Sequence, residues 1–293
     1  MNHHFRPRRS MLYVPGCNTR YLEKARSLPA DSLIFDLGDP ILFSAKEISR
    51  QNVVNAIREG GYGQREVVVR VNDLDSPWGH DDIRAVANIG ADAILFSNIE
   101  SRADVLSALA ALDQAGGQDL PIMVMIETPL AVLHAEEIAS ASERISCMVI
   151  ATSQLISQMN ARVTPDRMPI LTSLSLVVLA ARAYHRNVVD GNNNQIKDIA
   201  AFEYACRLGR DLGFDGKSLV HPMQLAYAND AFKPKPTEVK AAREIISALS
   251  EANAAGRGTV VVNDRLVERH HVKAAKRMLA LSEMIAKLEA ANV

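Results

Sequence analysis

Glu127 is the residue whose setting most strongly suggests chemistry. It follows five consecutive apolar residues, 122–126, and the whole stretch stands between Pro121 and Pro129. Such a run, without alternation, is typical of a strand that is buried on both faces. An ionised carboxylate at the end of a buried strand is costly unless a metal, a cation or several donors receive it. Glu127 is therefore a candidate site residue, and an ordinary solvated strand end is the alternative.

Other polar residues stand beside similar apolar runs. Arg9 precedes the first run, and the residues that close or follow later runs are Asp36, Asp39, Arg70, Asn72, Asn98, Gln154, Asp190 and His221. In a barrel of parallel strands the carboxyl ends of all strands meet at one mouth, so that residues far apart in sequence converge. We predict that this mouth is the active site. Turn and cap chemistry explains Asp36, Asn72 and Asp190 better than catalysis does.

The strands that must position these residues alternate with segments of helical periodicity. The eight predicted strands cover residues 11–16, 32–39, 67–72, 93–97, 121–127, 147–151, 188–190 and 218–221. This alternation indicates a parallel sheet, and eight strands are the number that closes a barrel. We therefore expect an α/β fold, a (β/α)8 TIM barrel over residues 1–232. A doubly wound open sheet is the alternative, but residues 14–18 (VPGCN) lack its glycine-rich first turn.

Residues 233–293 are predicted to form a C-terminal helical extension. A turn-rich linker at 233–237 precedes a helix that runs to about residue 252, a strand and turn at 259–264, and an amphipathic helix at 272–288. A segment of this size cannot build an independent core. We expect it to pack on the barrel or on a neighbouring subunit.

Composition excludes several classes of protein. Among 293 residues 48% are hydrophobic, which is ample for a large core, and the formal net charge is −1 with no dense basic run. This charge argues against a nucleic-acid binder. The apolar runs are too short for a membrane helix, and the first nine residues have no hydrophobic region behind their charges. We expect a soluble, cytoplasmic protein, and three widely spaced cysteines suit a reducing compartment.

Five motifs together resemble the citrate lyase beta-subunit-like family, whose members are relatives of the HpcH/HpaI aldolases. They are residues 9–16 (RSMLYVPG), 70–72 (RVN) with 76–79 (SPWG), 126–128 (IET), 213–217 (GFDGK) and 220–224 (VHPMQ). The resemblance extends over about residues 8–280. It implies a (β/α)8 barrel with a C-terminal extension, usually assembled as a homotrimer.

The resemblance also implies an activity. It points to a magnesium-dependent carbon–carbon lyase that acts on 3-hydroxyacyl thioesters, usually of coenzyme A, and releases an acyl thioester and a 2-oxo acid or glyoxylate. A divalent ion held by the hydroxyl and the carboxylate of the substrate lowers the pKa of the hydroxyl. By resemblance, Glu127 is a metal ligand, and Arg70 is a catalytic residue that binds the substrate carboxylate and faces the enolate. Glu268 falls at the catalytic acid that the extension contributes to a neighbour's mouth.

The sequence departs from the family pattern at four charged positions around this site. Gln154 and Ser153 replace an Asp metal ligand and the Glu before it, Gly38 replaces a Glu, and Asn98 replaces a Lys. An amide oxygen can still bind Mg²⁺, but the loss of a charged ligand weakens the site. We therefore expect Mg²⁺ to bind weakly or only with substrate. Asp39 remains as a second carboxylate that could act through a water.

Two further expectations concern position. Glu127 should line the barrel mouth within a few ångströms of Arg70, because both close strands that point to the same end. The nucleotide end of the thioester should lie near Arg9 and the first βα turn, since a cation and exposed amides suit phosphates. A solvated basic N-terminus is the alternative for Arg9. Asn98 and Asp39 complete the candidate substrate-binding residues.

Three functions remain open. The leading hypothesis is a lyase of this family that acts on a short hydroxyacyl-CoA such as malyl-, citramalyl- or citryl-CoA, because Arg70, Glu127 and Glu268 are retained. A non-catalytic or regulatory member that still binds a thioester is the second, and the changes at Gly38, Asn98 and Gln154 favour it. The third is a metal-poor hydrolase in which the C-terminal acid directs water at the thioester.

Overall fold

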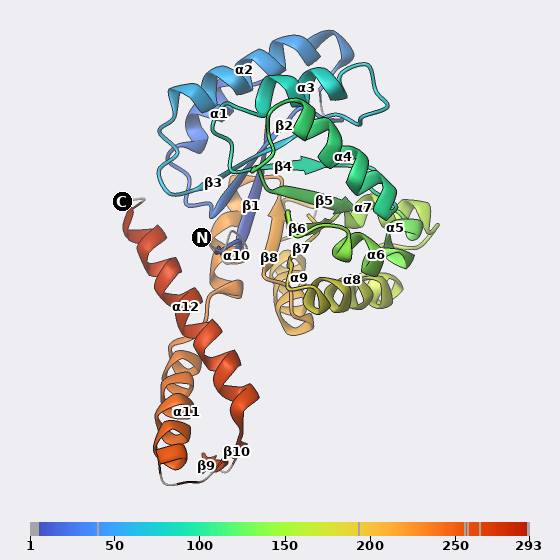
Figure 1. Ribbon diagram of the computed structural model, residues 1–293. Helices are drawn as coiled ribbons and strands as arrows, with labels where there is room; N and C mark the ends of the chain where they lie inside the picture. The colour runs from blue at the N-terminus through green and yellow to red at the C-terminus, as the bar shows by residue number, and fades with distance from the viewer. Residues whose placement is uncertain are drawn as a thin grey trace. The chain divides into compact units, whose positions relative to one another are not determined.

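The fold was analysed in a computed structural model that describes residues 6–39, 41–192, 194–254, 256, 258–263 and 265–291. Within these residues, eight parallel strands form a closed barrel in which each strand pairs with the next and the last pairs with the first (Figure 1). The strands are β1 (Ser10–Pro15), β2 (Ser32–Asp36), β3 (Glu66–Arg70), β4 (Ala93–Phe96), β5 (Ile122–Ile126), β6 (Ile145–Ile150), β7 (Asn187–Asp190) and β8 (Gly216–Leu219). The predicted (β/α)8 barrel is confirmed.

Helices follow every strand and surround the barrel (Figure 1). They are α1 (Thr19–Ala25), α2 (Lys46–Glu59), α3 (Gly79–Val86), α4 (Arg102–Gln114), α5 (Pro129–Leu133), α6 (Ala135–Ser140), α7 (Thr152–Gln158), α8 (Leu171–Ala183), α9 (Ile199–Leu212) and α10 (Leu225–Phe232). Three short 3-10 turns are η1 (Phe43–Ala45), η2 (Met168–Ile170) and η3 (Pro222–Gln224). No helix in the described part of the chain is long and apolar enough to cross a membrane.

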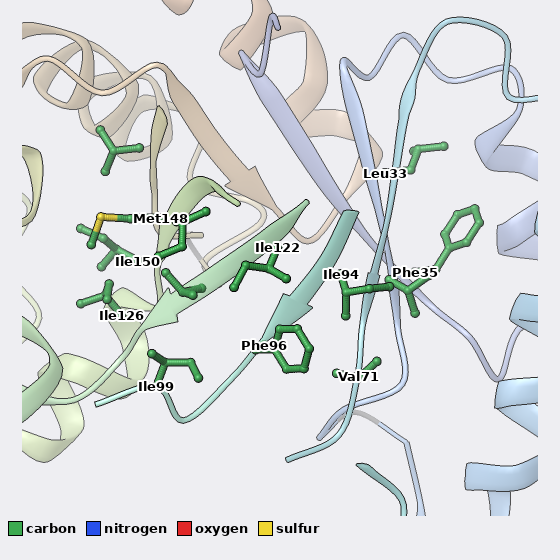
Figure 2. Close-up of a cluster of buried hydrophobic side chains, with 14 of the residues drawn as sticks. Leu33, Phe35, Val71, Ile94, Phe96, Ile99, Ile122, Ile126, Met148 and Ile150 are labelled. Carbon is green, nitrogen blue, oxygen red and sulfur yellow. The ribbon is translucent and has the colours of Figure 1, made fainter. Parts of the chain in front are cut away.

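The strands separate two apolar cores, and this explains why β5 shows no alternation in sequence. Met123 and Met125 belong to the cluster that fills the barrel interior. Ile122, Val124 and Ile126 belong to the larger cluster between the strands and the helices, part of which Figure 2 shows. Because successive side chains point to opposite faces, the residue after Ile126 has the parity of the interior set. Glu127 therefore turns toward the barrel interior.

Residues 233–291 form a second compact unit. Its helices α11 (Pro236–Ala254) and α12 (Arg269–Ala291) pack against each other and are joined through an antiparallel hairpin of β9 (Val260–Val262) and β10 (Arg265–Val267) (Figure 1). The sequence predicted both helices and the first of these strands, but not β10; Asp264, at the end of the predicted strand, lies outside the described residues. Part of the expected linker is helical, because a proline fits the first position of a helix.

Candidate functional site

A cavity of about 220 Å³ opens at the carboxyl end of the barrel. Four of the candidate metal- and substrate-binding residues line it together: Asp39, Asn98, Glu127 and Gln154. They come from segments that follow β2, β4, β5 and β6, and they meet because parallel strands share one mouth. The arrangement brings a buried carboxylate, an exposed carboxylate and two neutral amide residues to one cavity.

Glu127 is the buried acid of this cavity, with 1% of its surface exposed. The backbone N–H of Asn98 donates to its Oε1 at 2.5 Å. Burial raises the pKa of Glu127, while the Asn98 N–H and the positive charge of Arg70 oppose this rise. A carboxylate in this state is short of positive charge, because one N–H donor satisfies only part of its acceptor capacity.

Asn98 serves Glu127 through its backbone rather than its side chain. Its φ is 54°, in the left-handed region that Asn tolerates better than most residues. This turn directs its N–H at Glu127, while the side-chain amide donates to Asp73 Oδ2 at 2.5 Å. An interaction of the Asn98 side chain with substrate stays a prediction.

Arg70 is the last residue of β3, and its side chain has the parity of the residues that point into the barrel. Its guanidinium interacts with two acids other than Glu127, namely Asp36 and Asp39. Its Nε donates to Asp36 Oδ1 at 2.7 Å, and its Nη2 lies 3.7 Å from Asp39 Oδ2. Burial alone would lower the pKa of Arg70, but Asp36, the phenol group of Tyr13 and Asp39 hold it above its ordinary value. Arg70 and Glu127 thus lie at the same end of the barrel and interact electrostatically.

Gly38 provides the space for this position of Arg70. A Cβ atom on Gly38 would lie 2.6 Å from Arg70 Nη2 and 2.8 Å from its Cζ. Any larger residue at position 38 would displace the guanidinium, since these separations are far below van der Waals contact. The loss of an acid at this position therefore leaves room for the arginine.

The prediction that Arg9 lies near the nucleotide of a thioester is contradicted by the structure. Arg9 precedes β1, so it lies at the amino end of the barrel, opposite the mouth. Its side chain is buried and makes two hydrogen bonds with Asp31, at 2.9 Å from Nε and 2.8 Å from Nη2. Residues before a barrel strand lie at the amino end and residues after it lie at the mouth. Arg9 therefore cannot join the residues that follow the strands.

Gln154 is exposed in the first turn of α7, and its side chain has no hydrogen-bond partner in the part of the chain that the structure describes. The described residues contain no cluster of three His, Cys, Asp or Glu that could hold a metal ion. The donor set at the mouth nevertheless fits Mg²⁺, because Glu127 is a buried carboxylate with spare acceptor capacity and Gln154 offers an oxygen in the same cavity. Mg²⁺ commonly takes one or two carboxylates and keeps several waters.

Glu268 lies in the C-terminal unit, in the residue before α12. Its side chain is exposed, its carboxylate lies 3.3 Å from His270 Nδ1, and its backbone N–H donates to His271 Nδ1 at 3.0 Å. Its place in a neighbour's mouth, and the packing of the extension on the barrel or a neighbouring subunit, stay predictions.

Several residues that shape the mouth were not predicted from the sequence. Lys46 is buried at the start of α2, and its Nζ donates to Leu37 O, Gly38 O and Asn72 Oδ1 at 2.9, 2.8 and 2.5 Å. All three of its donors are therefore used, two on the loop after β2 and one on the segment after β3. Phe43 and Trp78 stack at 5.1 Å beside it and line the cavity. Only Trp78 was part of a noticed motif, and a lysine at a helix start is not distinctive.

Comparison with known proteins places the chain among characterised relatives. The model of the HpcH/HpaI aldolase/citrate lyase family matches residues 9–222. A (3S)-malyl-CoA thioesterase from Cereibacter sphaeroides is 42% identical over 290 residues, which cover 99% of this chain and 100% of that protein. The citrate lyase subunit beta of Escherichia coli (strain K12) is 31% identical over 285 residues, which cover 95% of this chain and 94% of that protein.

Solved structures share the fold. A citrate lyase from Burkholderia xenovorans LB400 superposes with a TM-score of 0.82 at 17% identity and covers 95% of both chains. The CitE protein of Mycobacterium tuberculosis, solved with magnesium, acetoacetate and coenzyme A, has a TM-score of 0.76 at 22% identity and covers 96% of this chain and 99% of that one. The family match and the full-length relatives lead to one conclusion: the chain belongs to the HpcH/HpaI aldolase/citrate lyase family.

Proposed function

We propose that the protein hydrolyses the coenzyme A thioester of a short 3-hydroxy dicarboxylic acid, with (3S)-malyl-CoA as the first substrate to test. The observation that carries this proposal is the 42% identity to a (3S)-malyl-CoA thioesterase over the full length of both chains. The identity to citrate lyase subunit beta is lower, at 31%. Hydrolysis was the third hypothesis from the sequence, and it becomes the first.

The mouth supports hydrolysis for a physical reason. Retro-Claisen cleavage must ionise a hydroxyl and stabilise an enolate, which depends on a firmly held cation. Gln154 contributes no charge to holding one. Hydrolysis depends less on a firmly held cation, because it forms no enolate. Water adds to the thioester carbonyl, the new C–O bond forms, and the C–S bond breaks to release the thiol of coenzyme A. Solvent reaches this mouth, since the side chain of Asp39 is 85% exposed.

Arg70 is the residue that we assign to the free carboxylate of the substrate. Its inner side is fixed by Asp36 at 2.7 Å, whereas Asp39 contacts it loosely at 3.7 Å from a solvated position. With Asp39 in solvent and this far away, the pair is weak, because water screens the exposed carboxylate. A substrate carboxylate can therefore replace Asp39 while Asp36 keeps the guanidinium in place. Lys46 cannot do this, because its three donors already have acceptors.

Two further roles complete the proposal. Glu127 and Gln154 would hold Mg²⁺, which supplies positive charge to the oxygens of the bound acid. Glu268, from the C-terminal unit of a neighbouring subunit, would accept the proton of the attacking water. The raised pKa of Glu127 supports the first role, because a buried carboxylate without a full set of donors is stabilised by a cation.

A thiol-release assay tests the proposal. Free thiol is measured with (3S)-malyl-CoA and with acetyl-CoA, which lacks the second carboxylate, each with and without Mg²⁺. We expect release from malyl-CoA and little from acetyl-CoA. Glu127→Gln should lower the rate at least about 100-fold, the scale of losing a charge-stabilising group. Glu143→Gln, an exposed acid in the turn before β6, is the matched control and should change nothing.

A lyase remains the second candidate, and the retention of Arg70 and Glu127 at the mouth favours it. It makes different products from the same substrate. Cleavage of the carbon–carbon bond of malyl-CoA gives acetyl-CoA and glyoxylate, and no free thiol.

A further inference from the structure

A second, larger cavity of about 450 Å³ lies in the outer layer of the barrel, lined by residues of α7, η2 and α9. It is separate from the mouth cavity, since none of the described residues lines both. Asp190, beneath it, points toward the helices, since a Cβ on Gly209 of α9 would lie 3.1 Å from Asp190 Oδ2. The proposed hydrolysis makes no use of this space.

The floor of the cavity holds two cations on one carboxylate. Arg167 donates to both oxygens of Asp190, at 2.8 Å from Nη1 and 2.6 Å from Nη2, and Lys217 Nζ donates to Oδ2 at 2.6 Å. The N–H of Gly191 also donates to Oδ1 at 2.8 Å. Each oxygen of Asp190 thus accepts two hydrogen bonds and has no capacity left. The three charged side chains carry a net charge of +1.

Lys217 has fewer hydrogen-bond acceptors around it than it has donors. Its side chain is 1% exposed, and an ammonium has three donors, yet Asp190 is the one acceptor that the described residues provide for it. Burial lowers the pKa of Lys217, as expected for a cation with too little negative charge around it. Arg167 and Lys217 both line the cavity, so their unused N–H groups are available to a ligand.

The rest of the lining suits an anion with an apolar body. Arg162 adds an exposed guanidinium at the rim, and it has no ion-pair partner among the residues that the structure describes. Asp198 is the one acid of the described lining, and it already accepts the N–H of Ala201 as the cap of α9. Ile156, Val163, Ile170 and Ala205 give the walls an apolar part. The remaining uncharged lining includes polar side chains, those of Thr152, Ser153, Thr164, Asn192, Asn194 and Gln195.

Arg167 has a backbone conformation that side chains rarely adopt. Its φ is 58° and its ψ is 18°, in the left-handed region, and it is neither glycine nor asparagine. Such a conformation persists only where surrounding structure imposes it, and it is found more often at binding sites than elsewhere. Here it holds the guanidinium on Asp190 at the cavity floor.

We propose that this cavity binds a small organic carboxylate, with its anionic group on Lys217 and Arg167 and a short apolar chain against the walls. A single carboxylate balances the single excess charge of the floor. The volume is within the range of small-molecule sites. The ligand would be distinct from the thioester, which belongs to the mouth.

Hexanoate is the probe, and isothermal titration calorimetry of the full chain is the measurement. Hexanol has the same apolar body without charge, and inorganic phosphate has charge without the body. We expect hexanoate to bind at one site per chain. Hexanol should bind at least about ten-fold more weakly, since a charge-assisted hydrogen bond accounts for about that factor. Phosphate should also bind at least about ten-fold more weakly, because it has no apolar chain to bury against the walls.

Variants locate the binding. Arg162→Ala should weaken hexanoate binding about ten-fold, and Ala201→Phe should abolish it by filling the cavity, while both variants keep the native melting temperature within a few degrees. Arg102→Ala removes an exposed arginine from α4 and should have no effect. Trp78→Ala alters the mouth cavity and should also leave hexanoate affinity unchanged.

The proposal is overturned if hexanoate does not bind the native protein, or if hexanol or phosphate binds as tightly. It is equally overturned if folded Arg162→Ala and Ala201→Phe proteins bind hexanoate like the native chain. Loss of binding in Trp78→Ala alone would place the carboxylate at the mouth and contradict the second site. None of these outcomes depends on thioester hydrolysis.

Discussion

At the scale of single residues, Glu127 links the stability of the protein to its activity. Its pKa is raised by burial, so between the unfolded value of about 4.3 and the higher folded value the folded protein binds more protons than the unfolded chain. Stability therefore decreases as pH rises through this window. Glu127→Gln removes the cost and should melt higher than the native protein at pH 7 without metal. Below pH 4 the difference should vanish, and a variant that melts lower at pH 7 would contradict this account of Glu127.

Gln154 offers a second test at this scale. A carboxylate at this position would add a charged ligand to Glu127 in the same cavity. Gln154→Asp should therefore tighten Mg²⁺ binding by about ten-fold or more, because ligand charge largely sets the affinity of such sites. Calorimetric titration of both proteins with Mg²⁺ measures this directly. Tight Mg²⁺ binding by the native protein without substrate, or an unchanged Mg²⁺ affinity in the variant, would show that Gln154 does not lie beside the metal.

At the scale of elements, ion pairs fix the amino ends of the strands. Arg9 and Asp31, before β1 and β2, are 2% exposed each and bonded to each other. Arg9→Ala would leave Asp31 buried without its cation, which typically costs about 3–5 kcal/mol of stability. We expect a much lower melting temperature and an unchanged Michaelis constant for the thioester in the folded fraction. A changed Michaelis constant with unchanged stability would show that Arg9 binds the substrate.

The barrel strands were predictable from sequence because nearly all of their residues are buried, on both faces. Every predicted strand overlaps an observed one, and several bounds agree within a residue or two; β5, for example, is Ile122–Ile126 against a predicted 121–127. The cluster at the mouth followed from topology alone, since parallel strands end together. Details set by tertiary contacts did not follow: Asn98 acts through a backbone N–H, Arg70 turns to Asp36, and Lys46 is buried by the loop it holds. Sequence spacing does not encode such contacts.

At the scale of the whole molecule, the proposal requires two subunits for one site. If Glu268 serves a neighbour's mouth, then Glu127→Gln and Glu268→Gln chains are each inactive alone but complement each other. Co-expressed in equal amounts, in the trimer that the family resemblance leads us to expect, they should recover about a quarter of native activity, because a site needs an intact residue from each of two chains and each is present about half the time. No recovery in mixed oligomers would place Glu268 outside the neighbouring site.

The products formed from (3S)-malyl-CoA test the central claim most directly. The purified protein is incubated with this thioester and Mg²⁺, and malate, free coenzyme A, glyoxylate and acetyl-CoA are quantified together. Hydrolysis predicts malate and free coenzyme A in equal amounts, without glyoxylate. Glyoxylate and acetyl-CoA in equal amounts, without free thiol, would show a lyase and contradict the proposed hydrolysis.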